Sequence, residues 1–221
     1  DTKAKEVPGV IAVIPLEDQA VVVADSTWAA MKGADVLKLV TSGGHKDLSD
    51  ESIFRRFRSD LSKSGVTAAH YGNLSKAIAK ANKVLELEYE MPMQAHATME
   101  PLCATASVSP DECNIWAPIQ NQDAVMGVAM AVTNLPAEKI KINTTFLGGG
   151  FGRKFEVDFL VAPLVASKVL GKPVKVIWSR EEDIRNDFFR PPTLAKMRIG
   201  LDSSGLPAVS YTHLTLPTIL R

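Results

Sequence analysis

The sequence predicts a mixed α/β (α+β) fold, and three observations support this prediction. Residues 139–178 read as a strand, a glycine-rich loop, an apolar helix and a second strand. Earlier in the chain, β-branched runs alternate with segments whose apolar residues recur at helical spacing. Of the 221 residues, 46% are hydrophobic and 23% are charged. That composition is typical of a globular chain with one sizeable core or two small ones.

The first part of the chain predicts two strands, at 7–14 and 20–24, and a helix at 27–39. Ser26 or Thr27 is suited to cap the start of that helix. After a glycine pair at 43–44, apolar residues return at helical spacing within 49–63, with arginines on the other faces. We interpret that charged face as solvated.

The second part alternates between the two element types. The predicted helices lie at 74–81, 122–132 and 156–170, and the last of them ends at Gly171. The predicted strands lie at 83–89, 103–108, 113–117, 139–147 and 174–178, followed by a hairpin over 197–209.

Charge and cysteine content exclude several classes of protein. Lys plus Arg and Asp plus Glu are equal at 25 each, which argues against a nucleic-acid partner. No apolar run reaches the roughly 18 residues that a membrane helix needs. The two cysteines, Cys103 and Cys113, form neither a CxxC pair nor a zinc site, and we expect them to be core residues.

The glycine loop at 148–154 (GGGFGRK) is the sharpest chemical feature. Its spacing matches neither a Walker A loop nor a dinucleotide fingerprint. Glycines between a strand and a helix start let backbone N–H groups approach an anion, and Arg153 and Lys154 add positive charge. The alternative is a tight structural turn, although four glycines cost backbone entropy. We favour an anion or cofactor site.

Two other segments carry polar side chains of interest. His96 and Glu100 lack the HExxH order of zinc proteases, and a structural role is the favoured interpretation of His96. Gln120 and Gln122 follow a predicted strand, at the edge where α/β proteins bind ligands. A glutamine there could hydrogen-bond an oxo or hydroxide group, and a solubilising role at the helix start fits equally well.

Four segments taken together resemble one protein family. HATMEP, IWAPIQNQ, GGGFGRK and VKVIWSREEDIRNDFFRP follow one another between residues 96 and 191. They resemble the molybdopterin-binding large subunit of xanthine dehydrogenases and aldehyde oxidases, most closely the isoquinoline 1-oxidoreductase β-subunit branch, often labelled aldehyde dehydrogenase. The resemblance covers residues 7–209, and its N-terminal part resembles the end of an α/β hammerhead domain.

This resemblance implies a molybdenum–molybdopterin cofactor, in the simple or the cytosine dinucleotide form. Molybdenum would be held through the pterin dithiolene, so no protein metal ligand is expected. The family's loop contacts carry over to Gly149, Gly150, Phe151, Gly152 and Arg153. Its glutamine beside the oxo ligand corresponds best to Gln120, with Gln122 as the weaker choice. Many members have glycine where this chain has Arg153.

The resemblance also implies a reaction and partners. Such enzymes oxidise an aldehyde or N-heterocycle with water-derived oxygen and pass electrons to a small two-iron, two-sulfur subunit, with a cytochrome c as a candidate final acceptor. The family's catalytic glutamate is expected beyond this chain's C-terminal end, so we assign no catalytic residue and expect the chain alone to be inactive. A periplasmic or membrane-associated location is expected over the cytoplasm.

The expected organisation has four segments. These are the end of a hammerhead-like domain (1–43), a linker (44–72), a partial molybdopterin-binding domain (73–209) and a tail (210–221). The tail resembles translated sequencing-adaptor read-through, and its alternative is a genuine hydrophobic strand. Two other functions stay open: a non-catalytic phosphate- or nucleotide-binding module that uses the glycine loop, and a purely structural domain.

Overall fold

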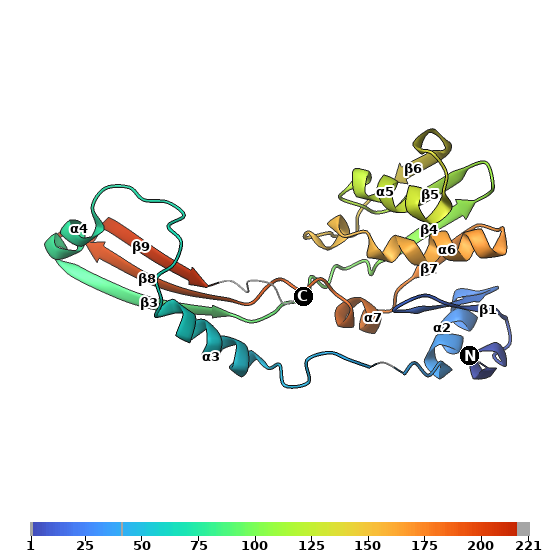
Figure 1. Cartoon of the computed structure of the whole chain (residues 1–221), viewed down its shortest axis with the longest axis horizontal. Helices are drawn as coiled ribbons and strands as arrows, with labels where there is room; N and C mark the ends of the chain where they lie inside the picture. Colours follow the sequence, from blue (N-terminus) through green and yellow to red (C-terminus); the bar gives the residue numbers. More distant parts are fainter. Residues whose placement is uncertain (1, 41, 216–221) are drawn as a thin grey trace. The chain divides into compact units, whose positions relative to one another are not determined.

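The computed structural model describes residues 2–40 and 42–215 (Figure 1), and it has the mixed α/β class that the sequence predicts. The chain folds into two compact units. The first unit combines residues 1–42 with 96–188, and the second combines 43–95 with 189–221. Within the described residues, no helix is long and apolar enough to cross a membrane.

A four-stranded sheet forms the centre of the first unit, in the order β6-β5-β4-β7. Its strands are β4 (Cys103–Val108), β5 (Cys113–Ala117), β6 (Ile140–Thr144) and β7 (Val174–Ile177). Only β5 and β6 are parallel, and the other pairs are antiparallel. Alternate residues of β4 and β5 are buried, so one face of these strands carries the core.

Two apolar helices pack against that buried face: α5 (Gln122–Thr133) and α6 (Val161–Leu170). Helix α5 is the crossover between the parallel strands β5 and β6, as a parallel pair requires. Asn121 caps α5 by accepting a hydrogen bond from Ala124, and the left-handed Asn134 ends the helix.

The N-terminal segment of the first unit forms a small α/β layer. It contains α1 (Thr2–Lys5), β1 (Val10–Pro15), β2 (Ala20–Ala24) and α2 (Thr27–Val36). Ser26 caps α2, in agreement with the sequence. Ile14 and Val21 pack with Val174 of β7 and with alanines of α6 in a second buried cluster.

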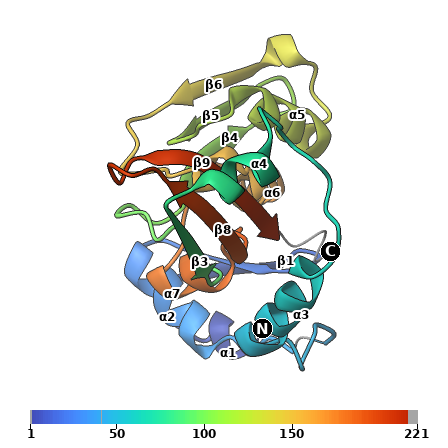
Figure 2. The ribbon, with the colours of Figure 1, turned by 90° about the vertical axis from the view of Figure 1, so that its left-hand side faces the viewer.

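The second unit is a three-stranded antiparallel sheet with two helices on one face (Figure 2). Its elements are α3 (Asp50–Leu61), α4 (Leu74–Lys80), β3 (Lys83–Met91), β8 (Thr193–Leu201) and β9 (Pro207–Thr215). Phe54, Phe57 and Ile53 of α3 bury Leu194 of β8. Gly200 faces the same side, where a Cβ would lie 3.0 Å from Ala81 beside α4.

The two units cut across the segments that the sequence predicts. Residues 44–72, expected as a linker, contain α3, which packs on the sheet of the second unit. Residues 73–209 divide between the two units. The reason is that β3 pairs with β8 along its full length, with Lys83 opposite Leu201 at one end, so both strands belong to the second unit. The pairing of two strands so distant in sequence cannot be predicted from the local sequence of either strand.

The predicted hairpin forms from β8 and β9 with a turn at Asp202–Leu206. Strand β9 continues through residues 210–215, which the sequence suggests are foreign to the chain, and pairs them with β8. The rest of that tail, 216–221, lies outside the described residues. Backbone ladders accept most side chains, so this pairing leaves the origin of the tail a prediction.

The largest local difference from the prediction lies after the glycine loop. The sequence predicts a helix from residue 156, but α6 begins at Val161 and is preceded by two single 3-10 turns, η2 (Arg153–Phe155) and η3 (Asp158–Leu160). Pro163 explains this start, because proline lacks the N–H that a helix interior needs and fits within the first turn. Two further short elements, η1 (Ala137–Lys139) and α7 (Arg180–Arg185), complete the fold.

Candidate functional site

The parallel strands β5 and β6 place two sequence-predicted segments side by side. Both strands end at the same edge of the sheet, at Ala117 and Thr144, and Thr145 N–H donates to the Ala117 carbonyl at 3.1 Å. The chain beyond β5 carries Gln120, and the chain beyond β6 carries the glycine loop. Gly152 N–H donates to Gln120 Oε1 at 3.2 Å. The glutamine and the loop therefore share one edge of the sheet, whereas the sequence places each of them after a strand without joining the two.

Left-handed backbone conformations shape the glycine loop. Gly149, Phe151 and Gly152 have φ values of +97°, +54° and +100°. Phenylalanine rarely adopts such a conformation, and strain of this kind is concentrated at binding and active sites. Among the described residues, no acceptor receives a hydrogen bond from the N–H groups of Gly149, Gly150 and Phe151. The loop thus offers consecutive free donors to a ligand.

Gly150 leaves room for the Gln120 side chain. A Cβ at Gly150 would lie 2.5 Å from Gln120 Oε1 and 2.7 Å from its Cδ. Such distances are too short for any real contact, so a side chain here would displace the glutamine amide. The loop and the amide therefore form one cradle, in which the Gln120 NH₂ group stays free to donate.

The segment 96–100 runs along the other side of the loop. Glu100 N–H donates to the Gly148 carbonyl at 2.9 Å, and Gly148 N–H donates to Glu100 Oε2 at 3.0 Å. A Cβ on Gly149 would lie 3.5 Å from Thr98 Cβ. Ala97, between His96 and Thr98, has a strained φ of +44°. Two strained segments therefore lie against each other.

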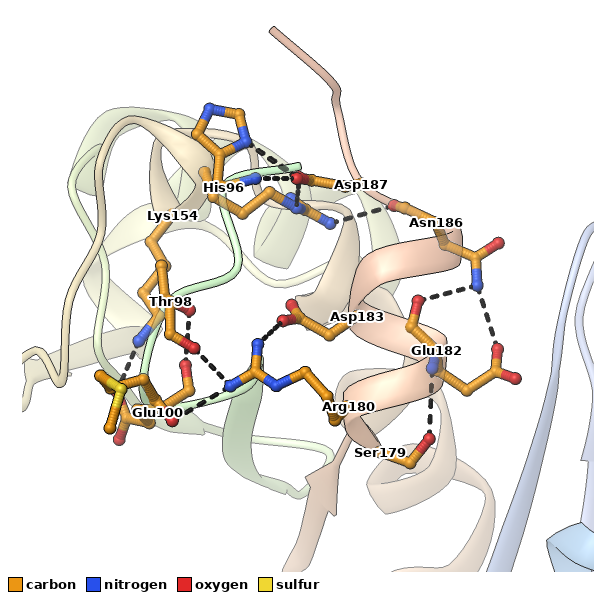
Figure 3. Close-up of polar contacts among 12 residues, drawn as sticks. His96, Thr98, Glu100, Lys154, Ser179, Arg180, Glu182, Asp183, Asn186 and Asp187 are labelled. Carbon is orange, nitrogen blue, oxygen red and sulfur yellow. Dashed lines mark hydrogen bonds and ion pairs between the residues drawn. The ribbon is translucent and has the colours of Figure 1, made fainter. Parts of the chain in front are cut away.

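The Lys154 side chain is fully buried and pairs with Glu100 at 2.5 Å (Figure 3). Burial acts to raise the pKa of Glu100, but the hydrogen bonds from Lys154 and Gly148 outweigh it, so the pKa lies below its ordinary value of 4.5. Glu100 is thereby held ionised beside the loop, where it fixes the loop's first glycine. Its charge is neutralised, which makes it a poor general base.

This ion pair predicts a pH dependence of stability. Because the folded-state pKa of Glu100 is lowered, the stabilisation is present above pH 4.5 and is lost as the pH falls through the folded-state value. Glu100→Gln is expected to reduce stability at neutral pH and to flatten the acid dependence. Urea unfolding from about pH 3 to about pH 7 checks this. The exposed Glu156→Gln is the control, and an equal flattening there would contradict the assignment.

Arg153 is also buried, with 1% of its surface exposed. Its two Nη atoms donate to both oxygens of Asp158 at 2.8 and 2.9 Å, which is a bidentate pair. Its Nε lies 2.9 Å from Asp187 Oδ1, as an ion pair whose N–H is not aligned for a hydrogen bond. The guanidinium also lies 5.1 Å from the centre of the Phe188 ring.

The side chains of Arg153 and Lys154 therefore do not add positive charge to the loop, and that expectation is corrected. Each cation points into the protein and is neutralised by carboxylates. The physical reason is that a buried cation without partners would be far costlier than one turned inward onto Asp or Glu. The helix start that the sequence predicts, and that would favour an anion, is also absent from the loop, because α6 begins only at Val161.

Helix α7 holds the segment 96–100 from a third side. Arg180 on this helix donates to the carbonyls of Thr98 and Met99, the latter at 3.1 Å, and to Asp183 at 2.6 Å (Figure 3). Asp183 is 3% exposed, and burial raises its pKa, with the charge of Asp187 adding to the effect and Arg180 opposing it. Ser179 caps the helix through Glu182 N–H.

The structure separates the two sequence-predicted glutamines. Gln120 contacts the loop, whereas Gln122 lies at the start of α5 and donates to Thr144 at 3.4 Å. Cys113 is fully buried, and burial raises the pKa of its thiol to about 11. Cys103 donates to Glu100 Oε1 at 3.7 Å, and burial raises its pKa as well. Both thiols are therefore poor nucleophiles.

Sequence reasoning missed the pairing of His96 with Asp187 and the role of Asp158. His96 Nδ1 lies 3.0 Å from both carboxylate oxygens of Asp187. The two residues occur in the quoted segments HATMEP and REEDIRNDFFRP, but no spacing rule joins positions so far apart. Within the described part of the chain, no three His, Cys, Asp or Glu side chains group as metal ligands.

Comparisons with known proteins agree on one family. The model of the molybdopterin cofactor-binding domain matches residues 58–214. The membrane-bound aldehyde dehydrogenase [pyrroloquinoline-quinone] of Gluconacetobacter polyoxogenes is 31% identical over 96% of this chain and 29% of its own length. Isoquinoline 1-oxidoreductase subunit beta of Brevundimonas diminuta is 28% identical over 86% of this chain and 26% of its own. The chain thus spans less than a third of these relatives.

Solved structures share the fold. A Cu,Mo-containing CO dehydrogenase matches 96% of this chain and 34% of its own, with a TM-score of 0.67 and 23% identity. The aldehyde oxidoreductase of Desulfovibrio desulfuricans matches 97% of this chain and 29% of its own, with a TM-score of 0.68 and 18% identity. At these identities the likeness concerns the fold alone.

Proposed function

Because this chain belongs to the molybdopterin cofactor-binding domain family, we propose that it supplies part of the cofactor site of a molybdenum hydroxylase. The family resemblance of its four motifs is confirmed by the same match. The observation that carries the proposal is their convergence. Segments 96–101, 119–122, 148–154 and 179–187, dispersed along the chain, contact one another around the free N–H groups of the glycine loop.

The residues present fit this cofactor. The N–H groups of Gly149, Gly150 and Phe151 are free donors for its anionic or oxo groups, and the Gln120 amide lies beside them. Gly152 and Arg153 contribute backbone to the same loop, while the Arg153 side chain supports it from within. No side chain of the cradle needs to ligate the metal, because a pterin dithiolene would hold it.

The reaction that we propose is the two-electron oxidation of an aldehyde or N-heterocycle. An aldehyde and water give a carboxylic acid, two protons and two electrons, and the electrons pass to a two-iron, two-sulfur partner subunit. The bound cofactor would supply the redox chemistry. The described residues bind and orient it: Gln120 directs its amide at the loop, and the paired Glu100 holds the loop closed.

The carboxylates near the loop do not supply a base. Glu100 is neutralised by Lys154, and Asp187 is engaged by His96 and Arg153. We therefore propose that the 221-residue chain retains cofactor without oxidising substrate. The cytosine dinucleotide form of the cofactor, a cytochrome c acceptor and a periplasmic or membrane-associated location belong to this proposal, and the membrane-bound relative supports the last of them.

The alternative of a plain phosphate- or nucleotide-binding module is less well supported. It relies on a helix start at the loop and on two free cations. The helix begins at Val161, and Arg153 and Lys154 are both paired with carboxylates. A helix start and free cations are the features that favour a simple anion at the loop, and the structure has neither of them at this place.

Cofactor retention tests the proposal directly. The chain is produced in a host that synthesises molybdopterin, and the purified protein is analysed for molybdenum by mass spectrometry and for pterin by the fluorescence of its oxidised derivative. We expect both in equal amounts, and no aldehyde oxidation. Absence of pterin together with saturable binding of a plain nucleotide would favour the alternative module. Aldehyde oxidation by the chain alone would contradict the assignment of the base elsewhere.

Gly150→Ala is expected to lower pterin retention by about tenfold. The added Cβ meets the mobile end of the Gln120 side chain, so the amide moves out of the cradle while the fold survives. Gly127→Ala is the matched control, because a Cβ there meets nothing within 4 Å on the exposed face of α5. It should retain pterin and gain up to about 1 kcal/mol of stability. A loss of stability in Gly150→Ala without loss of pterin would indicate a structural loop.

A further inference from the structure

One ring nitrogen beside the glycine loop has no partner. The His96 side chain is 10% exposed, and Asp187 engages its Nδ1. Among the described residues, nothing hydrogen-bonds its Nε2. That atom lies 3.7 Å from the position that a Cβ on Gly152 would occupy. The absence of a side chain at Gly152 therefore keeps the space between the ring and the loop open.

The contact with Asp187 favours a proton on Nδ1. An ionised carboxylate only accepts hydrogen bonds, so beside an ionised Asp187 the ring donates from Nδ1. In the neutral ring, Nε2 then presents a lone pair to the loop. Because Nε2 is not fully buried, its unpartnered lone pair is accessible to a ligand.

The ring is also held firmly in place. Asp187 accepts from the His96 backbone N–H as well as from the ring (Figure 3), and its Oδ1 also lies 2.9 Å from Arg153 Nε. Asp158 in turn binds Arg153 through two oxygens. This series of contacts holds the His96 ring in one orientation. The next residue in the chain, Ala97, has a strained backbone conformation. Such support is typical of a side chain that must meet a ligand at a set position.

We infer that His96 is a cofactor-positioning residue whose Nε2 accepts a hydrogen bond from an N–H group of the pterin bound on the glycine loop. The inference deepens the proposed function and rests on it. A pterin offers several N–H donors, which complement a lone pair as the loop's own N–H groups complement oxo and phosphate groups. His96 would supply the acceptor in a cradle otherwise made of donors.

Two substitutions at His96 distinguish the role of Nδ1 from the role of Nε2. In His96→Asn, the shorter amide can keep the bond to Asp187 while nothing reaches the position of Nε2. In His96→Gln, the longer amide can place its oxygen near that position. His45→Asn is the matched control, because His45 is exposed and its side chain makes no hydrogen bond among the described residues. Each variant is produced with molybdopterin as above.

The first readout is the ring itself, in the chain purified without cofactor. Nitrogen NMR of histidine-labelled protein should place the proton of His96 on Nδ1. Asp187→Asn should move it to Nε2, because an amide NH₂ can donate to Nδ1. The second readout is pterin and molybdenum content. We expect about a tenfold loss in His96→Asn, a smaller loss in His96→Gln and wild-type content in His45→Asn.

The outcomes distinguish this inference from the proposed function. If the wild-type chain retains no pterin, the proposed function fails and the inference falls with it. If the wild type retains pterin and folded His96→Asn retains as much, the inference alone is overturned. A proton found on Nε2 in the wild type also overturns it, because that atom would then donate. Circular dichroism and urea unfolding of each variant establish that a loss of pterin is not a loss of fold.

Discussion

Replacing Arg153 with methionine is expected to lower the free energy of unfolding by about 3–5 kcal/mol. Methionine fills much of the buried volume but leaves two carboxylates without their cation. Asp187 has 2% of its side chain exposed, so water cannot compensate for the missing partner. Asp158 loses both bonds of its bidentate pair, although it is 30% exposed and contributes less. Urea-induced unfolding followed by circular dichroism measures the change.

The exposed Arg185 provides the matched control for this substitution. It lies on α7, two residues before Asp187 in the sequence, and it makes no ion pair among the described residues. Arg185→Met should change stability by less than about 0.5 kcal/mol. Equal effects at the two positions would mean that the buried guanidinium is not what stabilises the site. Adding Asp187→Asn to Arg153→Met should recover part of the loss, because it removes the unpaired buried charge.

Phe57→Ala is expected to destabilise the second unit by about 3–5 kcal/mol. Phe57 is 5% exposed and packs with Ile53, Phe54 and Leu194. Its ring meets Phe54 edge to face, with centroids 5.9 Å apart, and that contact is lost together with the buried area. The substitution removes a large side chain from a small cluster. Few neighbouring side chains can shift to fill the cavity that is left.

Hydrogen exchange measured by mass spectrometry locates this effect. Faster exchange is expected in α3 and in β8, the two elements that the Phe57 cluster joins. Val66→Ala, at a position that is 98% exposed, is the control and should leave the exchange unchanged. Unchanged exchange in α3 of Phe57→Ala would show that this helix does not depend on the cluster.

Local patterns determined most of the secondary structure. Strands β4 and β5 have the bounds that their β-branched and alternating residues predict, and α5 and α6 end within a residue of the prediction. Each of these signals lies within a few neighbouring residues, where apolar period and capping groups act directly. The start of α6 differs from the prediction because apolar composition outweighs a single proline in the sequence pattern.

The sequence places Gln120 after one strand and the glycine loop after another, at ends where α/β proteins bind ligands. The parallel pairing of β5 with β6 in the structure is what brings the two to one edge of the sheet. The roles of these residues toward a cofactor remain proposals. The motif resemblance extends the same reasoning to the family, which the comparisons confirm.

Only the tertiary structure decided where the charges of the site point. In the sequence, Arg153 and Lys154 follow four glycines and suggest positive charge for binding an anion. Their ion-pair partners, Asp187 and Glu100, lie far away along the chain. The pairing of β3 with β8, and hence the division into two units, is equally remote. Burial sets the cost of an unpaired charge or an open strand edge, and burial depends on segments that meet only on folding. Local sequence therefore determines the elements and the segments that carry the site, while long-range packing brings those segments together and decides the electrostatics of the site.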